Sequence, residues 1–288
     1  MNNRLQSSNA AEGARRNAAR HWFTTPALQA SVGVHIGCVL LALLYPGFWQ
    51  WALGAVLLNH LILTTGVLLT KSRILGPNMT RLPAAAANRG EISITFDDGP
   101  DPEVTPLVLD LLDQYNAKAS FFCMANKVSS CPELAREIVK RGHSIENHTN
   151  SHPYAFAFFG PGCILREIKS AQDAIYSVTG VIPKFFRAPM GFRPPFLSPA
   201  LDRIGLRSVT WTRRGFDTFA KSPEPVLRRL LHDLAAGDIL LLHDGRPEQK
   251  KINQQILLEV LTRLLEHLRA NNLRSVSLPT GTHHKPEV

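Results

Sequence analysis

Two long runs of residues, 27–45 and 48–70, contain no Lys, Arg, Asp or Glu. A helix needs about 20 residues to cross the ~30 Å hydrocarbon layer of a membrane, and each run reaches roughly that length. Pro46 and the glycine after it separate the runs and favour a turn. Trp49 and Trp51 follow this break, and aromatic residues of this kind are enriched at membrane interfaces. The sequence therefore predicts an N-terminal hairpin of two transmembrane helices.

Basic residues flank both ends of this hairpin, whereas the short turn between the runs has none. They are Arg4, Arg15, Arg16 and Arg20 in the polar segment 1–26, and Lys71, Arg73, Arg81 and Arg89 in the segment 71–90. Because cytoplasmic flanks carry the excess of Lys and Arg, we expect a two-pass protein of a bacterial-type inner membrane with its C-terminal part in the cytoplasm. A single span with a re-entrant segment would place that part on the opposite side, and a cleavable signal peptide is a further alternative.

The remaining length is sufficient for one sizeable domain. We divide the chain into a basic disordered tail (1–26), the two transmembrane helices (27–70), a linker (71–90), a globular domain (91–280) and a short tail (281–288). The formal net charge of +9 fits a surface close to anionic lipid. The sequence has no helix-turn-helix, zinc-finger or RNP-type pattern. We therefore expect membrane lipid, and no nucleic acid, among the partners.

Strand-like and helix-like segments alternate through the globular domain. The predicted strands cover 91–96, 118–123, 185–187, 207–211, 238–243 and 274–278, and the predicted helices cover 104–115, 132–141, 163–178, 226–235 and 256–270. Repeated βα units of this kind form a parallel sheet. The fold class is therefore α/β, with a sheet that is either doubly wound or closed into a barrel.

Polar residues cluster after the first predicted strand and again farther along the chain. Asp97 and Asp98 come directly after the first one, and His148 and His152 lie four residues apart farther along. A solvated turn would explain the aspartates alone. Together, however, the residues supply two imidazoles and a carboxylate, and three protein ligands with one open position form a catalytic zinc site. Pro153 disfavours helical geometry at His152, so we expect this pair on a loop or a single turn.

Two further polar residues stand at strand ends. Arg187 could hold one of the aspartates ionised and oriented. His243 follows the apolar run 239–242, and a histidine at the tip of a buried strand could donate a proton. The alternative for His243 is a structural hydrogen bond to the backbone.

Five short sequence motifs follow one another along the chain and together form a recognisable set. They are TFDDGP at 95–100, HTNSH at 148–152, RAPMG at 187–191, the looser segment 211–218, and LLH at 241–243. In this respect the segment 91–278 resembles the polysaccharide deacetylases, also known as NodB-homology or carbohydrate esterase family 4 enzymes. The resemblance implies a distorted (β/α)7–8 barrel, preceded here by the membrane hairpin.

The resemblance also implies a role for each matching residue. Asp98, His148 and His152 would hold a divalent metal, with zinc suggested by the donor set. Asp97 would be the general base, His243 the general acid, Arg187 the residue that orients Asp97, and Asp217 the support of His243. The substrate-binding residues would be Pro189, Met190, Gly191, Trp211, Thr218 and Leu241, with a backbone N–H near Met190 stabilising the oxyanion.

Three positions depart from the family pattern. Met190 replaces the usual Tyr, Arg214 stands where an Asp is usual, and Thr218 stands where a Trp often walls the acyl pocket. We therefore predict a metal-dependent hydrolase that removes an acetyl or formyl group from an amino sugar in a polysaccharide, oligosaccharide or lipid-linked glycan. The alternatives are an amidohydrolase acting on a non-sugar amide and an inactive membrane-anchored scaffold.

Overall fold

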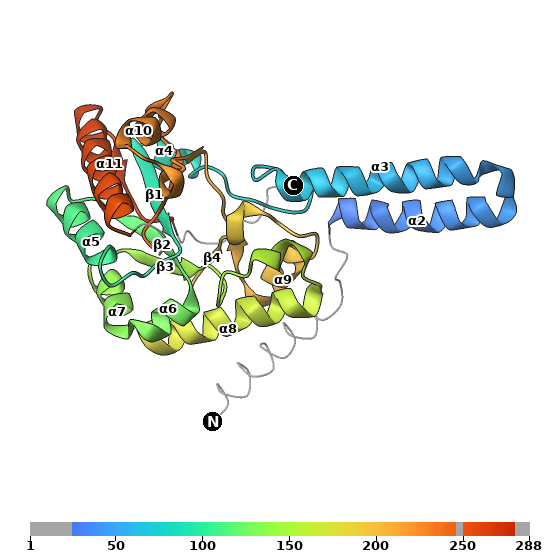
Figure 1. The fold of residues 1–288 in the computed structure, drawn as a ribbon, viewed down its shortest axis with the longest axis horizontal. Coiled ribbons are helices and arrows are strands. Elements are labelled where there is room, and N and C mark those ends of the chain that lie inside the picture. The colour runs from blue at the N-terminus through green and yellow to red at the C-terminus, as the bar shows by residue number, and fades with distance from the viewer. Residues whose placement is uncertain (1–24, 246–249, 280–288) are drawn as a thin grey trace.

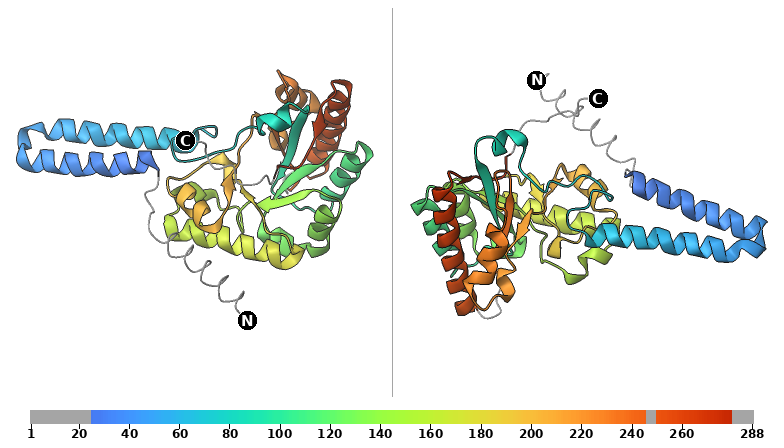
Figure 2. Two further views of the ribbon diagram at one scale, coloured as in Figure 1. Left: turned by 180° about the vertical axis from the view of Figure 1, so that it is seen from behind. Right: turned by 90° about the horizontal axis from the view of Figure 1, so that it is seen from above.

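The computed structural model describes residues 25–245 and 250–279. Figures 1 and 2 show a helical hairpin that extends away from an α/β domain. Most of the predicted tails (1–26 and 281–288) lies outside the described residues.

The hairpin consists of helices α2 (Pro26–Leu44) and α3 (Trp49–Leu68), which are joined by the 3-10 turn η1 (Pro46–Phe48). Their most apolar windows have mean hydropathies of 2.0 and 1.6, and only 11% of each window is buried. Both helices are therefore long and apolar enough to cross a membrane, although a signal sequence meets the same criterion.

Polar side chains meet between the two helices of the hairpin. Asn59 Nδ2 donates a hydrogen bond of 2.9 Å to Ser31 Oγ. The rings of His35 and His60 make an edge-to-face contact with centroids 5.2 Å apart. These contacts pair the helices, while leucines such as Leu40, Leu44, Leu57 and Leu58 are exposed on the outside of the hairpin.

Within residues 25–245 and 250–279, eight strands form the sheet of the domain, and all of them are parallel. They are β1 (Glu91–Asp97), β2 (Ala119–Cys123), β3 (Ser144–Asn147), β4 (Phe185–Phe186), β5 (Arg207–Ser208), β6 (Arg213–Arg214), β7 (Ile239–His243) and β8 (Arg274–Ser275). The spatial order is β5-β4-β3-β2-β1-β7-β6, and β8 pairs with the start of β1. The curled, parallel architecture confirms the predicted fold class.

Helices cover the outer face of this sheet. They are α5 (Thr105–Gln114), α6 (Ala125–Ser130), α7 (Pro132–Lys140), α8 (Pro161–Thr179), α9 (Leu197–Ile204), α10 (Pro223–Leu231) and α11 (Lys250–Ala270), and the single turn α4 (Ala84–Ala87) precedes β1. Ile92, Ile94 and Phe96 of β1 point into the large apolar core under these helices. Because side chains alternate along a strand, Thr95 and Asp97 point to the inner face of the sheet.

The segment 71–90 packs along the domain at the open side of the sheet. The backbone of Met79 bridges to Val209, and that of Arg81 bridges to Asp238. The strand expected over 207–211 is shorter, since β5 covers only Arg207–Ser208. The Val209 N–H still donates to the carbonyl oxygen of Phe186 in β4 (2.9 Å), and Met79 pairs along the opposite edge through Ser208 and Thr210.

One helix also differs from the prediction. The helix expected over 226–235 is α10, which begins at Pro223 and ends at Leu231. Proline is favoured in the first helical turn, which explains the earlier start. Asp233 has a φ of 51°, a left-handed conformation that cannot continue a right-handed helix.

Candidate active site and metal centre

The site lies at the carboxyl ends of the central strands. Strand register pairs Asp97 of β1 with His243 of β7, and Asn147 at the end of β3 with Cys123 at the end of β2. Loops that leave these strand ends carry Asp98 and His148. The parallel sheet thus brings together residues that are up to about 150 positions apart in the sequence.

Asp98, His148 and His152 offer three ligand atoms that all lie within 4.8 Å of one another. The Nε2 atoms of His148 and His152 are 3.3 Å and 3.5 Å from Asp98 Oδ1. His148 Nδ1 donates a hydrogen bond of 2.8 Å to the carbonyl oxygen of Arg187, which leaves its Nε2 lone pair for a metal. Two imidazoles and a carboxylate match the donor set of catalytic zinc sites, so these residues fit a divalent ion.

The electrostatic field at this point also favours positive charge. Burial alone would lower the pKa of His148, but the carboxylates of Asp97 and Asp98 raise it above its ordinary value. Burial likewise opposes ionisation of Asp98, yet the neighbouring histidines hold the pKa of that carboxyl well below its usual range. A divalent cation would be stabilised by the same carboxylates while leaving both histidines neutral.

The backbone around these three residues is strained. Asp98, Thr149 and His152 have φ values of 70°, 67° and 52°, in a region that is rare for residues other than glycine and concentrated at functional sites. The Thr149 N–H donates to Asn147 Oδ1 (3.0 Å), and the His152 N–H donates to Thr149 Oγ1 (2.9 Å). These bonds turn the segment so that both histidines face Asp98, on a loop as the sequence predicted.

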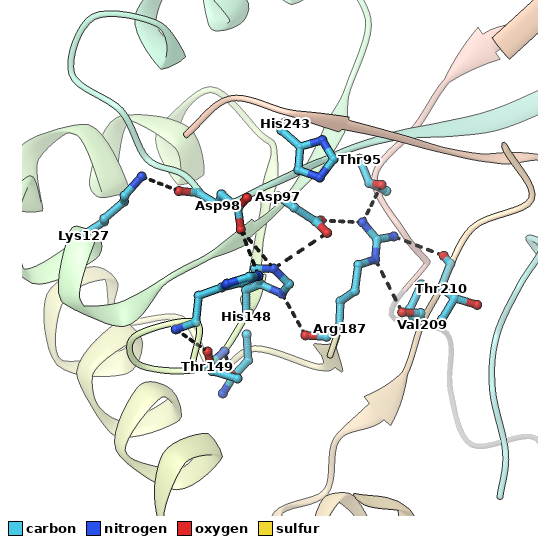
Figure 3. A network of polar contacts seen from close by, with 12 residues as sticks. Thr95, Asp97, Asp98, Lys127, His148, Thr149, Arg187, Val209, Thr210 and His243 are labelled. Atoms are coloured by element: carbon cyan, nitrogen blue, oxygen red, sulfur yellow. Dashed lines mark hydrogen bonds and ion pairs between the residues drawn. The ribbon is translucent and has the colours of Figure 1, made fainter. Parts of the chain in front are cut away.

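Arg187 has no exposed surface and ties Asp97 to the inner face of the sheet. Its Nη1 donates to Asp97 Oδ1 at 2.6 Å and to Thr95 Oγ1 at 2.8 Å, and its Nη2 donates to the carbonyl oxygen of Thr210 at 3.1 Å (Figure 3). The guanidinium lies 4.0 Å from the centroid of the Phe122 ring. A buried carboxylate is tolerated only when it is paired, and this pair also fixes its orientation.

His243 is held by Asp217, which opens the 3-10 turn η4 (Asp217–Phe219). Asp217 Oδ1 accepts from His243 Nδ1 at 3.0 Å, and Asp217 Oδ2 accepts from the His243 backbone N–H at 2.8 Å. Burial alone would lower the pKa of His243, but the Asp217 carboxylate, together with the carboxylates of Asp98 and Asp97, raises it above the ordinary value. The Nδ1–H is committed to Asp217, so Nε2 is the atom that can exchange a proton with a ligand.

A second layer of contacts fixes the loop after β1. Gly99 must lack a side chain, because a Cβ atom there would lie 2.4 Å from Asp244 Oδ1. Asp244 accepts a hydrogen bond of 2.6 Å from Thr105 Oγ1, and burial raises the pKa of Asp244 to about 7. Lys127 Nζ donates to the carbonyl oxygens of Asp98 (2.7 Å) and Gly245. Lys127 and Asp244 were missed by the sequence analysis, since no motif or spacing marks either one.

A small cavity opens at the centre of this arrangement. Its lining residues are Asp97, Asp98, His148, His152, Met190, Gly191, Trp211, Arg214, Leu241 and His243. Four of the six predicted substrate-binding residues line it, and Pro189 and Thr218 do not. Arg187 and Asp217 lie behind Asp97 and His243 rather than in the wall. Arg214, noted in the sequence only as a departure, forms part of the lining.

The chain is similar to known proteins in both sequence and fold. Residues 84–209 match the family described as polysaccharide deacetylase. The chain is 36% identical over 161 residues to a chitooligosaccharide deacetylase of Azorhizobium caulinodans, covering 56% of this chain and 76% of that protein. It is 32% identical over 199 residues to a peptidoglycan-N-acetylglucosamine deacetylase of Bacillus cereus, covering 66% of this chain and 87% of that protein.

Solved structures of similar proteins share the fold. A peptidoglycan N-acetylglucosamine deacetylase matches with a TM-score of 0.64 and 28% identity, over 70% of this chain and 91% of that one. A family 4 carbohydrate esterase from Streptomyces lividans matches with a TM-score of 0.59 and 29% identity, over 69% of this chain and 98% of that one.

Proposed function

The chain belongs to the polysaccharide deacetylase family and is a hydrolase of the amide bond in acylated amino sugars. From this premise we propose that the enzyme uses a divalent ion and works at the membrane surface. The donor set of the site favours zinc as that ion. The observation that carries the proposal is the meeting of three metal-ligand side chains with Asp97 and His243 at one edge of the sheet.

Asp98, His148 and His152 hold the ion. When bound, a divalent ion supplies Lewis-acid chemistry, which lowers the pKa of a water toward about 7 and polarises a carbonyl group. The hydrogen bond from His148 Nδ1 to the Arg187 carbonyl oxygen keeps the ring in the tautomer that a metal requires.

Asp97 acts as the general base. Arg187 occupies Asp97 Oδ1, which leaves Oδ2 on the side of His148. Asp97 accepts a proton from the attacking water, whose oxygen then bonds to the amide carbon. A backbone N–H near Met190 donates to the oxygen that becomes negative, the kind of contact that stabilises an oxyanion.

His243 acts as the general acid on the opposite side of the scissile bond. Its Nε2 gives a proton to the departing nitrogen as the C–N bond breaks, and the products are a carboxylate and a free amine. The Asp217 carboxylate favours the protonated ring that this step needs.

The hairpin places this chemistry at a membrane. Exposed leucines cover both helices, such as Leu43 (71% exposed) and Leu61 (63% exposed), and they would face lipid in a bilayer. Both helices span an inner membrane, and the basic flanks hold the catalytic domain on the cytoplasmic side. A membrane-bound substrate, such as a lipid-linked glycan, then reaches the site without leaving the bilayer.

The metal assignment is tested by elemental analysis of untagged, purified protein. We expect about one divalent ion per chain in the parent protein and an empty site in His148→Ala, because two ligands hold an ion far less tightly than three. His267→Ala, a histidine outside the site, is the matched control and should keep the ion. Full occupancy in His148→Ala would show that the ligands are misassigned.

The base and the acid are tested by turnover of an N-acetylated chitooligosaccharide. Asp97→Asn and His243→Asn should each lower the rate by about 10²–10⁴ while leaving the ion bound, since neither residue is a ligand. A folded, metal-loaded His243→Asn enzyme within a few-fold of the parent's turnover would refute the acid assignment. The result would then favour the alternative that His243 only completes a buried strand.

A further inference from the structure

A basic groove lies beside the catalytic cavity and has no role in the chemistry described so far. It has a volume of about 620 Å³. Ten residues line it, among them Lys71, Arg213, Arg214, Phe216, Arg228 and Arg229. Five of these ten are Lys or Arg, and none is Asp or Glu.

The groove connects the catalytic cavity with the membrane hairpin. Trp211 and Arg214 line both the groove and the cavity. Thr70 and Lys71 follow directly after α3, so the other end of the groove is where the chain would leave the bilayer. A ligand with its sugar in the cavity could therefore extend along the groove toward the lipid.

The junction between hairpin and domain is firmly built. Arg193 is 1% exposed, and its guanidinium donates to the carbonyl oxygens of Ser72 (2.6 Å), Gly76 (3.1 Å) and Pro77 (2.9 Å). Its backbone N–H donates to the Val67 carbonyl oxygen at the end of α3. These bonds hold Lys71 in a defined place beside the groove.

The cations of the groove differ in how far the fold itself uses them. Arg213 is paired with the buried Asp238 at 2.7 Å and also donates to two backbone carbonyls, so it is structural. Arg229 donates only to backbone carbonyl oxygens, each at 3.3 Å. Lys71 and Arg228 are both exposed, and neither forms an ion pair with a carboxylate among the residues that the structure describes. The groove therefore keeps positive charge directed to solvent.

We propose that this groove binds the phosphate or diphosphate ester through which the amino sugar is attached to a lipid carrier, an inference that rests on the proposed function. Arginine forks and a lysine match phosphate oxygens in charge and geometry. Phe216 (44% exposed) lines the groove beside these cations and offers apolar surface to the carbon chain next to the phosphate. A neutral chitin-like chain would make no use of the positive charge that the groove directs to solvent.

Binding of the phosphate group is measured first, without any turnover. The full-length protein is placed in zwitterionic phosphatidylcholine nanodiscs and titrated with inorganic pyrophosphate and with geranyl diphosphate by calorimetry. Lys71→Gln with Arg228→Gln should weaken both at least tenfold. The charge-matched pair Lys140→Gln with Arg269→Gln, on the distant helices α7 and α11, should stay within twofold. Equal affinities in the two double variants would overturn the proposal.

Two further measurements separate other sources of phosphate. If the groove instead holds a headgroup of the bilayer, anionic phosphatidylglycerol in the nanodiscs would abolish pyrophosphate binding to the parent protein, and the proposal would fail. A single-stranded oligonucleotide that binds in the groove more tightly than geranyl diphosphate would overturn it as well. Persistence of diphosphate binding in anionic discs supports the substrate assignment.

Kinetics separate this proposal from the proposed function. The ratio of kcat/KM for an N-acetylglucosamine joined by diphosphate to a short prenyl chain, over that for N-acetylchitotriose, should fall at least tenfold in the Lys71→Gln, Arg228→Gln variant. An unchanged ratio would refute the groove as a substrate site while deacetylation stands. Absence of turnover of either substrate, with diphosphate binding intact in the parent, would instead contradict the proposed function.

Discussion

Replacing Asp217 with Asn removes a buried negative charge that sits 3.0 Å from His243 Nδ1. The parent carboxylate raises the pKa of His243 against the effect of burial. Without that charge the pKa of His243 should fall, because only the carboxylates of Asp98 and Asp97 then oppose the effect of burial. The substituted amide must also point its oxygen at the His243 backbone N–H, which turns its NH2 group toward Nδ1 and disfavours the protonated ring.

The magnitude follows from the distance and the burial. An opposite charge within about 4–6 Å shifts a pKa by about 1–3 units, and Asp217 is only 5% exposed, so solvent screens the pair little. The general acid works when protonated, and a lower pKa moves the loss of activity to lower pH. The alkaline limb of the pH–rate profile should therefore shift down by about 1–3 pH units. At a pH above the alkaline limbs of both the parent and the variant, kcat/KM of the variant should be lower by about 10–1,000-fold.

The assay is kcat/KM against pH on a neutral N-acetylchitooligosaccharide, with metal content and thermal unfolding measured for each variant. Asp233→Asn is the matched control, because Asp233 pairs with His232 at 2.8 Å on the surface, where the side chains are 82% and 73% exposed. The pH profile of kcat/KM for Asp233→Asn should coincide with that of the parent enzyme. A folded, metal-loaded Asp217→Asn enzyme whose alkaline limb stays within about 0.3 pH unit of the parent would refute the proposed support of His243 by Asp217.

Three further outcomes are expected. Arg187→Met should lower the free energy of unfolding of the metal-free protein by about 3–5 kcal/mol, because Asp97 would stay buried without its cation. Adding Asp97→Asn should recover part of this loss. The control Arg136→Met removes an exposed pair with Glu133 and should lower the free energy of unfolding by less than about 1 kcal/mol. Leu57→Arg with Leu61→Arg should move the protein out of the membrane fraction, since each Arg costs about 2.5–3.5 kcal/mol at the centre of a span, whereas Leu107→Arg in the catalytic domain should not. Alkaline phosphatase fused after Val288 should be inactive if both helices span the membrane, and an active fusion would favour one span and an external domain.

The local order of residues determined much of this protein. The absence of charge over 27–70 predicted two helices with a break at Pro46, because a lipid-facing helix excludes charged side chains wherever it occurs. The alternation of apolar segments predicted a parallel α/β sheet, because buried strands and covering helices each leave their own periodicity. The donor types Asp98, His148 and His152 indicated a metal centre, and the motifs around them indicated the family.

Tertiary structure decided what depends on residues far apart in the chain. Strand register sets Asp97 beside His243, and no local pattern records which strands become neighbours. Lys127 and Asp244 act through single contacts with backbone and neighbouring side chains, so an isolated Lys or Asp in the sequence says nothing of them. The linker's Met79 pairs along the edge of β5 opposite β4, and Lys71 and Arg228 line one groove. Packing brings together such segments, whose separation in sequence carries no information about their separation in space.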